Sequence, residues 1–330
     1  MSLGMSLKTA DGREKSGIMV VRIVSEAYVP IFRAVEEKWI TDEALRAGSN
    51  KRGYLSTLRS DWWHALNFFL HRVFFRGRSD VVSRKFLDKT ITVLREMLGD
   101  EPELDLRALD AALKRAGVNN SEDRRMVVGT IEFTSGLQRY DFNIVDYVMS
   151  EYERGTHLER ILESLKSIPG VGDKTASMFL RDLFYHLRAS NLTQEECSLL
   201  QPIDVHVRRV ALRTGLVFEY LLKAGYTPSQ AATLLNEAGD EPIKLSISYF
   251  STVAGASPLE VNGGLWVVGK IACKPLRFDK LTPKGKSCVH NMSTLKREYN
   301  IDEPSFHGRR CLLYRSCPFY QTIAETLKLK

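Results

Sequence analysis

The sequence predicts an all-α protein, and the spacing of its apolar residues is the main reason. Over residues 55–73 apolar side chains recur every three or four positions, the period of an amphipathic helix. Similar segments follow at about 81–98, 104–116 and 121–136. No stretch alternates apolar and polar residues long enough to predict a β-strand.

Capping signals predict where the later helices begin. Thr156 and Glu159 form one potential capping box and Thr193 and Glu196 another, because each pair has the S/T-x-x-E spacing. Asp204 is placed as the N-cap of the segment VHVRRVALR. Pro228 suits the first position of a helix that ends near Gly239. Further helices are expected from about Asp173 to Ala189, at 242–254 and at 258–269, before a loop-like tail that starts near Cys273.

Length and composition indicate a folded protein of about two domains. The chain has 330 residues, of which 44% are hydrophobic and 26% charged. These values exclude a mainly disordered chain. No apolar run approaches the roughly 20 residues of a membrane span, and the segment at 18–24 is too short for a secretory signal. We therefore expect a cytoplasmic protein, nucleoid-associated if the source is prokaryotic.

The positive charge gathers at the C-terminal end. The whole chain has a formal net charge of +7, whereas residues 270–330 alone hold 13 Lys or Arg and five Asp or Glu, a net of +8. Such asymmetry is typical of a protein that binds a polyanion such as nucleic acid. A solvated basic surface that only aids solubility is the alternative.

Four of the five cysteines share this end: Cys273, Cys288, Cys311 and Cys317. An odd total without a secretion signal argues against a disulfide framework. Four clustered thiolates suit an iron–sulfur cluster or zinc, although the absence of C-x2-C makes a zinc ribbon less natural. A tail without metal is the third possibility. Cys197 is expected to be an ordinary buried residue.

The segment LKSIPGVGDKTASMFL (165–180) contains the most informative motif. Two predicted helices are joined by Ile168-Pro169-Gly170-Val171-Gly172, whose glycines leave backbone N–H groups uncovered beside a helix N-terminus. That combination forms an anion site suited to a phosphate. A tight turn without a ligand is the plain alternative. A P-loop is excluded because Asp173, not Gly, precedes Lys174.

This motif resembles the helix-hairpin-helix DNA glycosylases of the endonuclease III superfamily. The resemblance implies that Ile168, Pro169, Gly170, Val171, Gly172 and Thr175 contact double-stranded DNA, and that Lys174 is a catalytic nucleophile. The segment IDVHVRRV (203–210) is similar to a second family motif, in which Asp204 would be the catalytic carboxylate rather than only an N-cap. Gly117 to Ser121 resembles a third, weaker motif.

Three features depart from the family pattern. Lys174 and Asp204 are 30 residues apart, a longer spacing than the family usually has, and we interpret 189–201 as an insertion. The cysteines follow the pattern C-x14-C-x22-C-x5-C, in which only the final x5 agrees with the family's [4Fe–4S] ligands. The resemblance nevertheless implies that the four cysteines hold such a cluster. The glutamine that fills the space of an extruded base is missing, and Arg76 or Arg78 would take its place or hold phosphate.

The resemblance also implies an architecture and a reaction. A six-helix barrel-like domain would cover 54–200 and contain the helix-hairpin-helix at about 156–189. A second helical lobe would combine 17–53 with 201–330 and hold the cysteine loop at 273–317. The protein would be a base-excision DNA glycosylase with lyase activity, working as a monomer. A hydrolytic glycosylase and a non-catalytic DNA-binding iron–sulfur protein are the alternatives.

Overall fold

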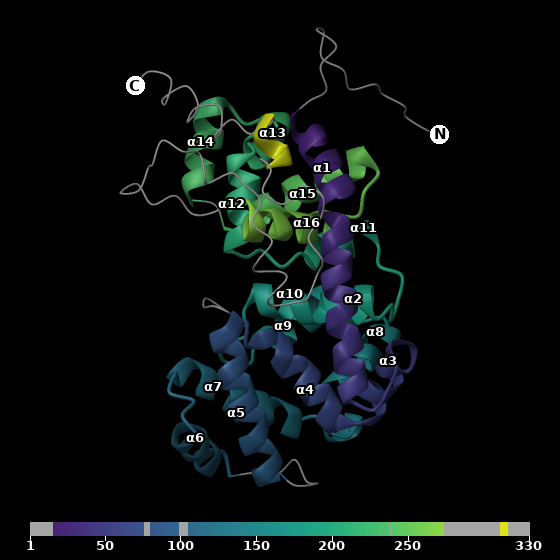
Figure 1. Ribbon diagram of the computed structural model, residues 1–330, viewed down its shortest axis with the longest axis vertical. Coiled ribbons are helices and arrows are strands. Elements are labelled where there is room, and N and C mark those ends of the chain that lie inside the picture. Colours follow the sequence, from purple (N-terminus) through teal and green to yellow (C-terminus); the bar gives the residue numbers. More distant parts are fainter. Residues whose placement is uncertain (1–15, 76–79, 99–104, 238, 274–310, 316–330) are drawn as a thin grey trace. The chain divides into compact units, whose positions relative to one another are not determined.

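The computed structural model describes residues 16–75, 80–98, 105–237, 239–273 and 311–315. Every regular element in these ranges is a helix, as the periodicity predicted (Figure 1). The chain forms two compact units. We call residues 40–192 the middle unit, and residues 1–39 with 193–330 the terminal unit. Within the described ranges, no helix combines the length and apolar character needed to cross a membrane.

The middle unit is organised around one apolar helix, α4 (Trp62–Val73). It packs against α3, α5, α8 and α10. Phe68 and Phe69 of α4 meet Phe179 of α10 edge to face, with ring centroids 5.7 and 5.0 Å apart. The other elements of this unit are the end of α2 (Val29–Arg46), α3 (Lys51–Ser60), α5 (Asp80–Leu98), α6 (Leu106–Arg115), α7 (Ser121–Ser135), η1 (Gln138–Tyr140), α8 (Ile144–Glu153), α9 (Leu158–Lys166), α10 (Asp173–Arg181) and η2 (Asp182–His186).

The terminal unit is built around α16 (Pro258–Ile271), which α1, α11, α12 and α15 contact (Figure 1). Two glycines allow this close packing. A Cβ atom on Gly263 would lie 2.3 Å from the ring of Phe32, and one on Gly264 would lie 2.5 Å from Val24. The remaining helices are α1 (Ser16–Ala27), the start of α2, α11 (Gln194–Leu199), α12 (Val205–Arg213), α13 (Leu216–Lys223), α14 (Pro228–Glu237), α15 (Glu241–Ala254) and η5 (Leu312–Arg315).

Two local predictions are wrong, because the side chains of Asp61 and Thr156 form other hydrogen bonds than the sequence pattern predicted. The segment 55–73 is two helices, since Asp61 ends α3 and caps α4 by accepting a hydrogen bond from His64 N at 2.9 Å. The Thr156–Glu159 capping box does not form. Helix α9 begins after His157, and the Thr156 hydroxyl instead donates to Glu151 at 3.0 Å.

The other capping predictions are confirmed. Thr193 and Glu196 form a reciprocal capping box, with Glu196 N donating to Thr193 Oγ1 at 3.2 Å and Thr193 N to Glu196 Oε2 at 2.7 Å. Asp204 caps α12, and Pro228 is the first residue of α14. Helices α11 and α12 therefore begin where a short polar side chain caps the first turn, and α14 begins at a proline, whose fixed φ suits the first helical position.

The two units differ from the sequence-based ranges in two places. Residues 40–53 belong to the middle unit, where α3 packs against α4 and α8. Residues 193–200 belong to the terminal unit, where α11 packs against α15 and α16. Packing between helices, which periodicity alone does not reveal, decides both assignments.

A buried ion network joins three segments of the middle unit. Arg72 of α4 is fully buried, and its Nη1 donates to both carboxylate oxygens of Glu43 at 2.7 and 2.6 Å. Its Nε donates to Asp182 Oδ2 at 3.0 Å, while Arg181 donates to Asp182 Oδ1 at 2.9 and 2.7 Å. Burial alone would raise the pKa of Asp182, but Arg181 and Arg72 outweigh it and leave that pKa lowered.

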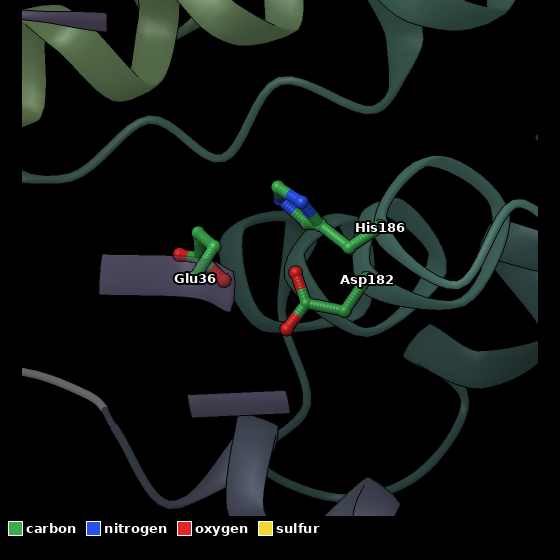
Figure 2. Close-up of side chains that lie close together, drawn as sticks. All are labelled: Glu36, Asp182 and His186. Carbon is green, nitrogen blue, oxygen red and sulfur yellow. The ribbon is translucent and has the colours of Figure 1, made fainter. Parts of the chain in front are cut away.

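The same network fixes an irregular turn at the end of α10. Residues Asp182–His186 form a π-helical turn, in which Leu187 N bonds to Asp182 O at 3.0 Å. Figure 2 shows Asp182 and His186 projecting from this segment. Burial, followed by the charge of Arg181, lowers the pKa of His186 to about 3, so its imidazole is neutral at pH 7. Helix α10 is thus held at its C-terminal end by charge pairs that are shielded from water.

The substitution Arg72→Met should destabilise the protein strongly, because it leaves Glu43 and Asp182 buried with less compensation. Breaking a buried pair by removing one partner costs about 3–5 kcal/mol. The matched control is Arg125→Met, which removes an exposed pair with Glu122 (3.2 Å) worth about 0–1 kcal/mol. Urea unfolding followed by circular dichroism would measure both losses. Equal losses in the two variants would contradict a structural role for the network.

Candidate nucleic-acid interface and cysteine site

Helices α9 and α10 are joined by a tight turn. Val171 N donates to Ile168 O at 3.0 Å, and Gly170 has φ of 81°. These values define a type II β-turn over Ile168-Pro169-Gly170-Val171, in which the third position needs a positive φ and favours glycine. Proline at the second position supplies the matching negative φ. The local sequence therefore dictates the shape of this turn.

The turn is anchored by its apolar residues and exposes the rest. Ile168 is 1% and Val171 5% exposed, whereas Pro169, Gly170 and Gly172 are exposed. Helix α7 passes directly behind the turn. A Cβ atom on Gly129 would lie 2.5 Å from Pro169 Cδ, so only glycine permits this approach. The middle unit thus presents a fixed, exposed stretch of backbone before α10.

Side chains at the start of α10 hold the turn and balance its charge. Thr175 is buried, and its hydroxyl lies 3.2 Å from Gly172 N and 3.1 Å from Gly172 O, so this side chain bonds within the turn. Asp173 lies 2.7 Å from the ammonium of Lys166. This hydrogen bond, together with one to Glu163, raises the pKa of Lys166. The acidic residue at the helix N-terminus is therefore neutralised by its own neighbour.

Lys174 lies on the first turn of α10 and is half-buried. Its ammonium donates to the backbone carbonyl of Phe75 at 2.9 Å. Phe75 immediately precedes the segment that contains Arg76 and Arg78, two predicted DNA contacts that lie outside the described residues. The structure therefore brings Lys174 to the end of the α4 segment, 99 residues away along the chain.

Asp204 lies in the terminal unit and caps α12. Its Oδ1 accepts hydrogen bonds from His206 N at 2.8 Å and Val207 N at 2.9 Å. Two backbone donors fix the carboxylate at the start of the helix and leave the second oxygen to act on other groups. Lys174 and Asp204 belong to different units, and the structure describes each within its own unit.

The start of α12 is fixed from behind by α16. A Cβ atom on Gly269 would lie 2.6 Å from His206 Cβ and 2.8 Å from His206 O. Burial lowers the pKa of His206, although the charge of Asp204 opposes this shift. The glycine that follows the apolar run of α16 therefore sets the distance between the two helices next to Asp204.

The other end of α12 reaches one predicted cysteine ligand. Arg213 Nη1 lies 3.3 Å from Cys273 Sγ, and Arg209 Nη1 donates to Cys273 O at 2.8 Å. Cys311 is 8% exposed, and its sulfur lies 3.9 Å from the Tyr28 hydroxyl. Cys273 and Cys311 both pack against the core of the terminal unit. The other two predicted ligands, Cys288 and Cys317, lie outside the described residues.

The two described cysteines fit a metal or cluster site by their chemistry. Thiolate sulfur is the form that binds iron or zinc, and a guanidinium beside Cys273 suits a negatively charged sulfur. Burial lowers the pKa of Arg209, whereas the nearby Cys273 opposes that shift. Cys197 is also 8% exposed, as predicted for an ordinary buried residue.

Sequence reasoning missed Arg209 and Arg213 as neighbours of Cys273. Their spacing of four residues places both on one face of α12, which was a usable signal. It also missed the ion network of Arg72, because nothing local marks a basic residue in an apolar helix as buried. The partners of Arg72, which are Glu43 and Asp182, become apparent only when segments that are distant in the sequence pack together.

The described residues form an all-helical protein. Its middle unit exposes a glycine-containing turn before α10, and its terminal unit packs Cys273 and Cys311 against its core. Searches of protein-family models, curated proteins and solved structures found no match to this chain.

The substitution Gly129→Ala should displace the turn, because the added methyl group would overlap Pro169. Overpacking of this kind costs about 1–3 kcal/mol. The control is Gly172→Ser in the same turn, where a Cβ atom meets nothing within 4 Å and φ is −110°. Serine is a good N-cap, so the control should change stability by less than about 0.5 kcal/mol. Unfolding free energies would test this contrast, and an unaffected Gly129→Ala variant would refute the close approach.

Proposed function

We propose that this protein is a DNA glycosylase with lyase activity that removes a damaged or mismatched base. The observation that supports it most is the exposed turn at 168–172, followed at once by Lys174 on the first turn of α10. An exposed glycine turn before a helix N-terminus suits a DNA phosphate, and a lysine beside it suits attack on the neighbouring sugar. The resemblance to endonuclease III supplies the reaction type.

The turn would bind the DNA backbone near the target nucleotide. The positive end of the α10 dipole, which lies at the first turn of that helix, favours a phosphate there. Neutralisation of Asp173 by Lys166 removes a charge that would otherwise repel the phosphate. Arg76, Arg78 and the basic C-terminal residues would add contacts that depend on salt but not on sequence.

The chemistry would start once the target nucleotide has left the stack, because its C1′ atom is inaccessible within a duplex. The neutral amine of Lys174 attacks C1′, the bond from C1′ to the base nitrogen breaks, and the base leaves with that electron pair and takes up a proton. One of the two nitrogen protons then passes to O4′ as the C1′–O4′ bond breaks, and the nitrogen lone pair forms the C1′=N bond of a protonated Schiff base. Removal of a 2′ proton then expels the 3′ phosphate by β-elimination and cuts the strand.

Asp204 would stabilise the positive charge that develops on the sugar. One carboxylate oxygen is held by two backbone N–H groups, so the charge is fixed in place before the reaction. A charge that need not reorganise is the most effective kind of electrostatic catalyst. The same carboxylate could accept the proton that Lys174 must lose.

A hydrolytic glycosylase is the second candidate, and one contact favours it. The amine of Lys174 is engaged with Phe75 O at 2.9 Å, so attack on a sugar requires this bond to break. If the bond persists on DNA, Lys174 positions the segment after α4, and a water activated near Asp204 performs the hydrolysis.

We propose that Cys273, Cys288, Cys311 and Cys317 hold a [4Fe–4S] cluster, which would supply a structural crosslink for the C-terminal segment. Freshly purified protein should then be coloured and contain about four iron atoms per chain. The substitution Cys273→Ser should reduce the iron content, whereas Cys197→Ser should not. Stoichiometric zinc, or a colourless protein after anaerobic purification, would contradict the cluster.

Borohydride trapping tests the lyase reaction directly. The full chain, incubated with an abasic-site duplex and sodium borohydride, should form a covalent protein–DNA adduct, because borohydride reduces a Schiff base to a stable amine. Lys174→Gln should abolish the adduct while retaining a side chain that can donate to Phe75 O. Lys114→Gln, an exposed lysine on α6, should not.

Asp204→Asn separates the candidates further. Asparagine caps helices as well as aspartate does, so the variant should fold normally while losing the charge. Lost base release with unchanged DNA affinity would support catalysis by Asp204. An adduct that survives Lys174→Gln would overturn Lys174 as the nucleophile, and the absence of any adduct in the native protein would overturn the Schiff-base proposal. If the native protein forms no adduct and also releases no base, it is a non-catalytic DNA-binding protein.

A further inference from the structure

A pocket of about 180 Å³ lies within the middle unit, away from the turn at 168–172. The end of α2, α3, α4 and α5 form its walls. Nothing in the proposed function uses it. Its polar and aromatic lining residues are Glu43, Arg46, Tyr54, Trp63, His64, Asn67, Phe68, His71 and Arg95.

The charges of the lining favour an anion. Arg46 and Arg95 are exposed and therefore lie at the opening of the pocket. Glu43, the acid of the lining, is buried, and Arg72 binds both of its oxygens at 2.7 and 2.6 Å. Burial, followed by the charge of Arg72, lowers the pKa of His71 to about 3, so this histidine is neutral at pH 7. Two arginine charges thus remain for a ligand.

The inner surface is aromatic and rigid. Tyr54 and Phe68 pack edge to face with centroids 6.0 Å apart, and both are buried. Trp63 is half-buried, and Trp62 supports it edge-on at 5.9 Å. The Arg95 guanidinium lies 5.6 Å from the centre of the Trp63 ring. An aromatic ring entering the pocket can therefore stack on Trp63 while its substituent reaches an arginine.

Asn67 adds a polar group between these parts. Its amide nitrogen donates to Trp63 O at 2.7 Å, so the side chain is fixed and can offer its oxygen as an acceptor. A few fixed polar groups in an aromatic cavity are what orient a small ligand. An apolar cavity of about 150 Å³ can hold benzene, so this pocket has room for one ring system.

We propose that this pocket binds a small aromatic anion, with its ring against Trp63 and its phosphate or carboxylate between Arg46 and Arg95. A nucleotide has this chemistry, either free or as the end of a DNA strand. The inference does not depend on the proposed glycosylase activity, since it rests on different residues.

Isothermal titration of the full chain with phenyl phosphate and with deoxyadenosine 5′-monophosphate tests the pocket. At least one probe should bind saturably, and inorganic phosphate or the nucleoside alone should bind more weakly. Trp63→Leu and the double variant Arg46→Gln/Arg95→Gln should each weaken binding by about tenfold. Arg107→Gln, an exposed arginine on α6 outside the pocket, should leave it unchanged.

The remaining outcomes identify the source of the ligand or reject the site. Competition by a 5′-phosphorylated oligonucleotide, lost in the arginine variant, would assign the pocket to strand ends, and its absence would assign it to free nucleotides. Lys174→Gln should bind the probes normally, which separates this site from the proposed catalytic one. No saturable binding of either probe, or equal affinity in Trp63→Leu, would overturn the proposal.

Discussion

The buried charge of Arg72 is the constraint on which the middle unit depends. A guanidinium with no exposure must have its charge compensated, and here Glu43 and Asp182 do so from segments distant in the sequence. This requirement ties the end of α2 to α4 and to the π-helical turn after α10. Buried ion pairs contribute little net stability, but removing one partner is costly. The network therefore specifies a single arrangement of these three segments, and α10 carries Lys174 within that arrangement.

Helix α12 plays the corresponding part in the terminal unit. Its first turn is capped by Asp204, and its last two turns direct Arg209 and Arg213 to Cys273. Gly269 of α16 lies against His206 in the first turn of α12. A group held by Cys273 would consequently restrain the helix that presents the proposed catalytic carboxylate.

The two anion sites that we propose in the middle unit differ in their chemistry. The turn at 168–172 leads into the N-terminus of α10, whose dipole would favour a phosphate without regard to what it is attached to. The pocket beside Trp63 offers two arginine side chains above an aromatic wall, which would select an anion that carries a ring. Glu43 lines this pocket and also belongs to the Arg72 network. The buried ion pairs of that network therefore also fix one side chain of the pocket lining.

The sequence by itself determined the all-helical class, the turn over 168–171 and most helix starts, because each depends on neighbouring residues. Gly170 needs a positive φ, and Asp204 caps the residues that directly follow it. At Asp61 and Thr156 two local signals competed, and there the sequence pattern predicted a continuous helix and a capping box, respectively, that the structure does not have. The burial of Arg72, the approach of Gly129 to Pro169 and the guanidinium groups at Cys273 were decided only by the tertiary structure. Each is a contact between residues far apart in the chain, and no periodicity or spacing encodes which distant side chains will meet.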